Sequence, residues 1–509
     1  MKMLALVSIL SILTACGDGS GESDTDKLPA INTPYIQTAD WVAGEYSPSR
    51  YFANRCIDPR SNDSYQDLVG TYVDENNWLR SWSHETYLWY KELPDIDPET
   101  ITDPIDYFNL MKTNVLTNSG QDKDRFHYAR DTEKYKQYAE SGVSAGYGFT
   151  VSLIQEGPSR RATIVYSEPN SQAALKGIKR GTEIISVDGV AIANGDPDLI
   201  NARLAPSTLG EAYPFVIRDL NALSERTVIL ESTSVTKVPV HTAKIITSNE
   251  RKVGYLLLNS FGIATAEQQL IDVINTFKNK QINELVLDLR YNGGGYLAIS
   301  AELGTMIAGN TSLGKVFTEL AYNDKRRMEN EYYSFPMSSF GIEKPAISGI
   351  LLPQLSLPRV YIISTNNTAS ASEYLINGLR GVNVEVILMG TATTGKPYGF
   401  LPEENCGTTY FTVQFKGQNS QGFGDFADGF IPSGTDNGQE QVRGCSVLDD
   451  LTHPLGDINE KMLATALYHI KNDSCPTNTL GLNSKSSHPL SSLRGKVLRT
   501  DTTGLIKQN

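Results

Sequence analysis

Between about residues 235 and 468 the chain alternates apolar strand segments with amphipathic helical segments, and this alternation limits the possible folds more than any other feature. Residues 252–258 and 285–287 form apolar runs that predict strands. Between them the apolar residues recur at helical spacing, at Ala266, Leu270, Val273, Ile274 and Phe277. A second strand, helix, strand series follows at residues 360–363, 370–379 and 384–389. Two β-α-β units predict an α/β fold with a parallel or mixed sheet covered by helices.

The first residues have the pattern of an export signal. Met1 and Lys2 precede an apolar run at residues 3–13, which is too short to span a bilayer but has the length of a secretory signal core. Residues 13–16 read Leu-Thr-Ala-Cys, which resembles the lipobox of bacterial lipoproteins. The resemblance implies a signal peptide at residues 1–15 and a lipid on Cys16, with Gly17 favouring the outer membrane. An ordinary signal peptide with an incidental cysteine is the alternative.

Residues 16–36 are rich in Gly, Ser, Asp and Thr and cannot bury enough apolar surface to fold, so we expect a tether. No later segment is long and apolar enough to cross a membrane. We therefore expect a soluble body, anchored by its lipid in the bacterial cell envelope, on the periplasmic side or the surface of the outer membrane. The net charge of −13, without a Lys/Arg cluster, argues against nucleic acid as a partner. The oligomeric state stays open.

Four further cysteines, Cys56, Cys406, Cys445 and Cys475, form an even set, which in an exported protein favours two disulfides over a metal site. No Cys-x-x-Cys pair occurs, and we expect neither a metal nor another cofactor. Three connectivities are possible. We expect Cys406 to pair with Cys445, because this bond would close a short loop between strands near one edge. Four free, buried cysteines are the alternative.

Two smaller domains are expected before the α/β core. Residues 37–141 are aromatic with helical spacing and predict a small helical domain, with its aromatic residues in the core. Residues 142–233 contain an alternating strand that begins at Phe149, a short helix at residues 171–175 and a tight Asp-Gly turn at residues 188–189. The core then takes residues 234–475, and residues 476–509 form a polar C-terminal tail.

The order and spacing of the elements in residues 142–233, from Gly-Tyr-Gly-Phe to the Asp-Gly turn, closely resemble a PDZ domain. The resemblance implies peptide capture by strand addition: a C-terminal carboxylate would bind the backbone amides of Tyr147, Gly148 and Phe149, with its strand beside residues 149–154. Some domains of this kind act as lids. A domain that only packs against its neighbour is therefore the alternative.

Three segments of the core carry residue types that acyl transfer needs. Residues 368–373 read Thr-Ala-Ser-Ala-Ser-Glu, residues 395–396 are Gly-Lys, and residues 288–295 read Asp-Leu-Arg-Tyr-Asn-Gly-Gly-Gly. A serine hydroxyl needs a base to take its proton, and none of the six histidines lies in a recognisable catalytic context. The one Gly-x-Ser-x-Gly match, at residues 142–146, lies outside these three segments, at the start of residues 142–233. A lysine can serve as the base if a dry, apolar site keeps it neutral.

Together these segments resemble the carboxyl-terminal processing (tail-specific) serine peptidases, over about residues 142–435. The resemblance implies a crotonase-like core behind a PDZ domain, polypeptide substrates, Ser370 as the nucleophile and Lys396 as the general base. It also implies an oxyanion hole made by the amide of Ala371 and an amide at Gly293 or Gly294. Physically, a serine at a helix start has free N–H groups and the positive end of the helix dipole beside it.

This chain departs from the family pattern in two ways. Ser370 and Lys396 are one residue further apart than in the commonest members, and Phe400 stands where many members carry a polar residue that orients the lysine amine. The third catalytic group is therefore unidentified. Thr368 replaces the first serine of the motif. Glu373 is interpreted as a structural residue that complements the helix dipole.

The leading hypothesis is an exported, lipid-anchored serine endopeptidase with a Ser370/Lys396 dyad and a PDZ domain that recognises C-terminal tails. The alternative is a catalytically inactive scaffold that binds polypeptides at the membrane through its PDZ groove. A third hypothesis takes the crotonase-like core as an enzyme of acyl-thioesters. That hypothesis predicts a nucleotide-sized pocket for coenzyme A.

Overall fold

The computed structural model describes residues 41–62, 64–117, 119–156, 159–206, 208–248, 250–477 and 496–498. The expected signal peptide, Cys16 and the tether lie outside the described residues, as does most of the C-terminal tail. The described residues from Val42 onward belong to one compact unit. Within the described ranges, every helix is too short or too polar to cross a bilayer.

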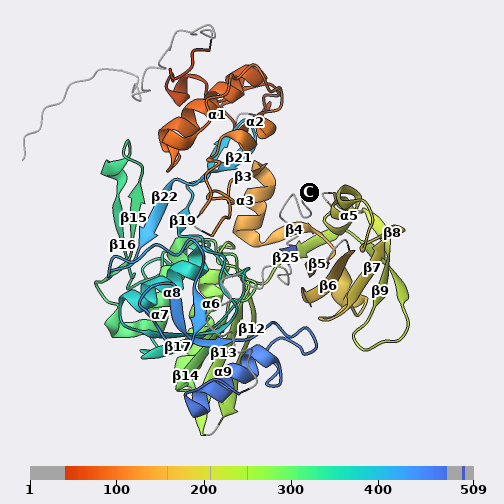
Figure 1. Ribbon diagram of the computed structural model, residues 1–509, viewed down its shortest axis with the longest axis vertical. Helices are drawn as coiled ribbons and strands as arrows, with labels where there is room; N and C mark the ends of the chain where they lie inside the picture. Colours follow the sequence, from red (N-terminus) through yellow and green to blue (C-terminus); the bar gives the residue numbers. More distant parts are fainter. Residues whose placement is uncertain are drawn as a thin grey trace, which may run out of the picture. The chain divides into compact units, whose positions relative to one another are not determined.

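The core is built on a seven-stranded sheet (Figure 1). Its strands, in spatial order, are β12 (Val240–Ser248), β13 (Arg251–Leu258), β14 (Glu284–Asp288), β17 (Arg359–Ser364), β18 (Glu385–Gly390), β24 (Gln441–Ser446) and β23 (Ile431–Ser433). β12 runs antiparallel to β13, and the other neighbouring pairs are parallel. Successive residues of the strands belong alternately to two hydrophobic clusters, one on each face of the sheet. The first cluster contains Leu256, Leu287 and Ile362, and the second contains Leu257, Val286 and Ile363.

Helices cover both faces of this sheet because each face carries one of the two clusters. α6 (Ala266–Asn279), α7 (Leu297–Ala308) and α8 (Ala371–Gly381) pack on the first cluster, and α9 (Lys461–Asn472) packs on the second. The helices predicted at residues 266–277 and 370–379 end within two residues of α6 and α8. The prediction of an α/β core with a mixed sheet is confirmed.

Two small sheets extend the core. One contains β16 (Glu331–Ser334), β15 (Val316–Tyr322), β22 (Phe415–Gln418) and β19 (Tyr398–Gly399). The other contains β20 (Glu403–Asn405), β21 (Thr408–Phe411) and β3 (Tyr128–Asp131), so a strand from early in the chain pairs with a late hairpin. Three short 3-10 helices lie in the connecting loops: η3 (Gly309–Thr311), η4 (Arg327–Glu329) and η5 (Pro345–Ile347).

The aromatic N-terminal region packs on this hairpin. It contains η1 (Ser49–Tyr51), β1 (Arg55–Cys56), β2 (Leu68–Val69), α1 (Tyr72–Thr86), η2 (Tyr90–Glu92), α2 (Pro104–Leu110) and α3 (Thr132–Ser141). Thr71 caps α1 by a capping box, and Asp103 caps α2 by accepting the N–H of Ile105 at 2.7 Å. Trp78 and Trp82 are buried in one cluster with Tyr410 of β21. These two tryptophans are therefore core residues, and that core is shared with the hairpin.

The second large sheet has the spatial order β10 (Arg226–Glu231), β9 (Ala212–Arg218), β7 (Glu183–Val187), β6 (Ser159–Ser167), β5 (Phe149–Glu156) and β25 (Lys496–Leu498), with β8 (Val190–Ala191) paired to β7. Its helices are α4 (Gln172–Leu175) and α5 (Pro197–Leu204). The predicted hairpin is present, with Asp188 and Gly189 both at positive φ, 51° and 74°. A two-stranded ribbon of β4 (Val143–Gly146) and β11 (Thr233–Thr236) leads into and out of this sheet.

The disulfide pairing differs from the predicted one. Cys56 bonds to Cys406, with Cα atoms 5.3 Å apart, and Cys445 bonds to Cys475, with Cα atoms 5.7 Å apart. The pairing of Cys406 with Cys445 was wrong because β21 and β24 belong to different sheets. Cys406 lies in the turn of the β20–β21 hairpin and meets the N-terminal region, whereas Cys445 lies inside the central sheet beside the end of α9.

Candidate active site

Three loops meet at the carboxyl ends of three neighbouring parallel strands. The glycine loop, residues 289–295, follows β14; the serine turn, residues 368–372, comes after β17; and the lysine loop, residues 393–396, comes after β18. Ligand sites of open α/β sheets form at this edge, because the loops after parallel strands converge there. The structure therefore brings together the three segments that the sequence singles out.

Ser370 has a strained backbone at the start of α8. Its φ of 56° and ψ of −119° lie outside the regions that residues other than glycine ordinarily adopt. A sharp strand-to-helix turn of this kind projects a nucleophilic serine toward the substrate side. Residues 368–372 read Thr-Ala-Ser-Ala-Ser, without the glycines of a Gly-x-Ser-x-Gly elbow, so this geometry could not be predicted from them.

The glycine loop holds the serine turn in this conformation. The Thr368 hydroxyl donates to the Leu289 carbonyl at 2.8 Å, and the Ser372 hydroxyl donates to the Asn292 carbonyl at 3.0 Å. Gly294, at a φ of 100°, lies directly against the turn: a Cβ there would come within 2.8 Å of the Cβ of Ser370. Only glycine fits at this position.

The structure distinguishes the two candidate glycine amides. The amide of Gly294 donates to the side-chain oxygen of Asn292 at 2.9 Å, so it is committed within the loop. Among the described residues, neither Gly293 nor Ala371 has a recorded acceptor for its amide. The amides of Gly293 and Ala371 are therefore the pair available to a developing oxyanion.

Lys396 is partly exposed as a residue, but its amine lies among aromatic rings. Lys396 Nζ is 3.7 Å from the ring centroid of Phe400 and 5.3 Å from that of Phe126. Desolvation lowers the pKa of Lys396 from its ordinary 10.5 to about 7, although the carboxylates of Asp124 and Glu373 oppose this shift. A large fraction of the amine is therefore neutral near pH 7, as a general base requires.

Glu373 connects the serine to the lysine. Its fully buried carboxylate accepts the backbone N–H of Ser370 at 2.9 Å and that of Lys396 at 2.8 Å on the same oxygen. The other oxygen accepts the N–H of Gly395 at 2.7 Å and the hydroxyl of Thr393 at 2.6 Å. Burial raises the pKa of Glu373, and these four donors oppose that rise. The sequence interpretation, a helix-start residue that complements the dipole, missed this connection between two loops.

Ser370 and Lys396 are adjacent without a direct hydrogen bond. Because both amide nitrogens bind one oxygen of Glu373, they lie within about 6 Å of each other. In the described part of the chain, no hydrogen bond joins the lysine amine to the serine hydroxyl. The amine rests on Phe400 instead. Catalytic hydrogen bonds are often long before substrate binds, and the lysine has a flexible four-carbon stem.

A buried ionic network supports the glycine loop. The fully buried guanidinium of Arg290 contacts the carboxylates of Asp288, Asp449 and Glu460, each at 2.8 Å. Arg180, from the loop before β7 of the second large sheet, reaches the same Asp449 at 2.6 Å and the Tyr291 hydroxyl at 2.6 Å. Desolvation would raise the pKa of Asp449, but the two guanidinium groups lower it. This network fixes the loop at its start and ties it to the second sheet.

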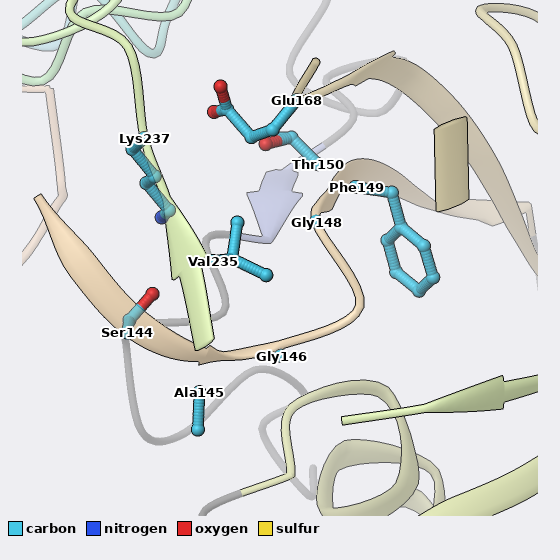
Figure 2. A pocket seen from close by; sticks show the side chains of 9 residues that line it. All are labelled: Ser144, Ala145, Gly146, Gly148, Phe149, Thr150, Glu168, Val235 and Lys237. Carbon is cyan, nitrogen blue, oxygen red and sulfur yellow. The ribbon is translucent and has the colours of Figure 1, made fainter. Parts of the chain in front are cut away.

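The residues predicted to bind a peptide carboxylate line the start of β5. The Tyr147 and Phe149 side chains are buried, and the Gly148 carbonyl accepts the Glu168 N–H at 2.7 Å. A small pocket adjoins this loop, and Figure 2 shows the side chains of Glu168, Thr150 and Lys237 at one end of it. Burial raises the pKa of Glu168 to about 7. The outer edge of β5 is paired with β25 from the C-terminal segment.

Two residues near the lysine loop were not expected from the sequence. Arg125 Nη2 donates to the carbonyls of Thr394 and Gly395 at 2.9 Å and 3.2 Å, and Phe126 flanks the amine of Lys396. Neither residue belongs to a motif or a periodic pattern. A single sequence therefore holds no signal that would have marked them.

Comparisons with known proteins agree with this geometry. Residues 252–401 match the family model described as Peptidase family S41, and residues 74–128 match that of the Peptidase S41 N-terminal domain. A carboxyl-terminal-processing protease of Picosynechococcus sp. is 26% identical over 266 residues, which is 52% of this chain and 58% of that protein. Carboxyl-terminal-processing peptidase 1, chloroplastic, of Arabidopsis thaliana is 22% identical over 340 residues, 66% of this chain and 62% of that protein.

The chain thus spans about three fifths of the length of these two curated relatives. Among solved structures, a protein from Bacteroides fragilis assigned as an S41 protease superposes with a TM-score of 0.58 at 24% identity. The match covers 82% of this chain and all of that one. This likeness shows a shared fold.

Proposed function

Because the chain belongs to peptidase family S41, we propose that it is a serine endopeptidase that hydrolyses peptide bonds in exported polypeptides with a Ser370/Lys396 dyad. The observation that carries the proposal is the carboxylate of Glu373, which binds the backbones of both residues. A desolvated lysine beside a strained serine has the features of a nucleophile with its base.

In the proposed reaction, neutral Lys396 accepts the hydroxyl proton while Ser370 Oγ bonds to the substrate carbonyl carbon. The amides of Gly293 and Ala371 donate to the oxyanion that forms, at the N-terminus of α8. The lysine ammonium then gives its proton to the leaving amine as the C–N bond breaks. Water, deprotonated by the same lysine, hydrolyses the acyl-enzyme and restores the serine. Rotation of the lysine side chain away from Phe400 precedes the first proton transfer.

The test combines turnover with covalent labelling. Purified protein should digest an unfolded protein such as casein, and a fluorophosphonate probe should modify Ser370, mapped by mass spectrometry. Other serines, including Ser372 two residues away, provide the internal control. If the protein neither digests casein nor is labelled at Ser370, the proposal is contradicted. Peptide binding without labelling of Ser370 would instead support the inactive scaffold, the alternative function.

We further propose that the second large sheet is a PDZ domain that binds extended polypeptides at the edge of β5. β25 supports this role because it runs antiparallel to β5, with Leu498 opposite Val151 and Lys496 opposite Leu153. The segment therefore heads toward the loop at Tyr147–Phe149, as the strand of a captured peptide would. A substrate strand and the chain's own segment would compete for one edge.

This competition predicts the effect of two prolines. In the full chain, Val497→Pro/Leu498→Pro should raise the affinity for a fluorescent peptide of residues 493–500 several-fold, measured by anisotropy. Adjacent amides of a strand point to opposite sides, so one of the two prolines must remove a donor facing β5. The control, Val497→Ala/Leu498→Ala, keeps both donors and should bind the peptide as the wild type does. Equal affinities for all three proteins would contradict the role of β5.

For location, we propose export to the bacterial cell envelope and a lipid on Cys16. The leader pattern supports export, and two disulfides are typical of an oxidising compartment. Metabolic labelling with a radioactive fatty acid tests the anchor directly, since Cys16→Ser should abolish incorporation.

A further inference from the structure

The backbone of the lysine loop lies between two opposite charges. The peptide group joining Thr394 to Gly395 donates its N–H to Glu373 at 2.7 Å, and its carbonyl accepts from Arg125 at 2.9 Å. The next peptide group, joining Gly395 to Lys396, does the same at 2.8 Å and 3.2 Å. Each peptide dipole is thus aligned between a carboxylate and a guanidinium. This arrangement opposes rotation of the backbone that carries Lys396.

The guanidinium is itself held in place. Arg125 Nη2 also donates to the Ala427 carbonyl at 3.0 Å, and Nη1 donates to the Asp122 carbonyl at 3.2 Å. Its contacts with the lysine loop cross about 270 residues of sequence. Desolvation lowers the pKa of Arg125, while Glu373 and Asp428 favour the charged form. An arginine stays protonated in such a desolvated site, whereas a buried lysine loses its proton much more readily.

The residues on either side of Arg125 face the lysine side chain. Phe126 lies on one side of the amine and Phe400 on another. Buried Asp124 is the carboxylate that contributes most to the lysine electrostatically, and the Tyr87 hydroxyl orients it at 2.7 Å. Glu373 is the other carboxylate that acts on the amine.

We propose that the segment Asp124–Phe126 builds the base site: Arg125 positions the backbone of Lys396, and Phe126 with Phe400 keeps its amine out of water. Many members of the family orient the lysine amine with a polar residue at the position of Phe400. In this chain the segment Asp124–Phe126 has that orienting role instead. This inference takes one point from the proposed function, the assignment of Lys396 as the general base. Arg125 and Phe126 are positioning residues, because they act on the lysine and not on the substrate.

The first test measures the amine itself and needs no turnover. Lys396 is acylated with acetic anhydride from pH 5 to 10, and its modified peptide is quantified by mass spectrometry. Reactivity follows the neutral amine, so the midpoint should lie near pH 7 in the wild type. Phe126→Asn admits water and should move the midpoint up by about one pH unit, which is a tenfold loss of neutral amine at pH values well below the midpoint. Phe126→Leu keeps the site apolar and should leave the midpoint near its wild-type value.

The second test uses kinetics. Arg125→Ala should lower kcat about 10- to 100-fold with little change in KM, since a misplaced catalytic group loses rate and not substrate affinity. Arg125→Lys should recover part of the loss. Arg130→Ala is the matched control: Arg130 lies on β3 over the ring of Tyr128 and should retain wild-type kcat.

The outcomes separate the two proposals. An unchanged labelling midpoint in both Phe126→Asn and a second variant, Phe400→Asn, would overturn the inference even if the wild type cleaves protein. A shifted midpoint in a protein that cleaves nothing would support the inference and contradict the peptidase. Wild-type kcat in Arg125→Ala would overturn the role of the arginine. Circular dichroism spectra matching the wild type show that each variant has folded.

Discussion

Replacing Lys396 with methionine is expected to lower kcat/KM for a peptide substrate by roughly 10²- to 10⁴-fold, because a general base contributes a factor of that size and the serine is a poor nucleophile without one. Methionine keeps the length and apolar contacts of the stem beside Phe126 and Phe400. The loss would therefore report the missing amine and not a cavity. Initial rates on a fluorogenic peptide measure it.

The pH profile of the wild type gives the same assignment independently. The active form of Lys396 is the neutral amine, so kcat/KM should rise tenfold per pH unit below its pKa and level off above it. With a pKa of about 7, the acid limb should bend near pH 7. A lysine of ordinary pKa would place the bend near 10.5.

Two further variants control this prediction. Lys396→Arg keeps the charge but cannot release its proton, so it should be inactive across the profile. Lys416→Ala removes an exposed lysine from β22 and should behave as the wild type. It is a matched control because β22 pairs with β19, the strand that follows the lysine loop. Near-normal turnover by Lys396→Met would show that another group is the base.

The methionine variant should also be the more stable protein at pH 7. Because the pKa of Lys396 is lowered in the folded state, the unfolded chain binds more protons between about pH 7 and 10.5. Stability therefore rises with pH through that window, and below it the cost of the charged amine is fully present. Methionine carries no such cost, so activity and stability should change in opposite directions.

Arg290→Met is expected to destabilise the fold by about 3–5 kcal/mol, because removal of one partner leaves buried charges uncompensated. The guanidinium is fully buried against Asp288, Asp449 and Glu460. Without the guanidinium, Asp449 keeps Arg180 as a cationic partner. Among the described residues, Asp288 and Glu460 then have no ion pair. Urea denaturation followed by tryptophan fluorescence measures the shift in midpoint.

Arg443→Met is the matched control. Arg443 also pairs with two carboxylates, Glu385 at 2.7 Å and Asp473 at 2.9 Å, but its side chain is 31% exposed. Such a pair contributes about 0–1 kcal/mol, so the midpoint should hardly move. The prediction fails if the two arginine variants denature at the same urea concentration.

The α/β core could be predicted because each of its strands and helices has a recognisable pattern of apolar residues within its own short segment of sequence. Residues 253–258 and 360–363 carry no charged residue, as strands buried on both faces require, and the helix between residues 266 and 277 keeps one apolar stripe. Once parallel strands are inferred, their carboxyl ends meet at one edge. The serine, lysine and glycine segments follow such strands, so their convergence was predictable too.

The features that sequence reasoning missed depend on which surfaces pack together. Cys406 lies near Cys445 in sequence, yet its partner is Cys56, because the hairpin packs on the N-terminal region. Arg125 reaches the lysine loop for the same reason. The strain at Ser370 comes from hydrogen bonds between the serine turn and the glycine loop, which no single segment encodes.

The bond between Cys56 and Cys406 makes the molecule dependent on its redox surroundings. It joins residues 350 positions apart, and closing so long a loop restricts the unfolded chain by roughly 6 kcal/mol on an entropic estimate. A reducing cytosol does not sustain such a bond. There the region that contains Arg125 would be held by non-covalent packing alone. We expect reduction of this bond to lower the stability of that region, and with it the support that Arg125 gives to the lysine loop.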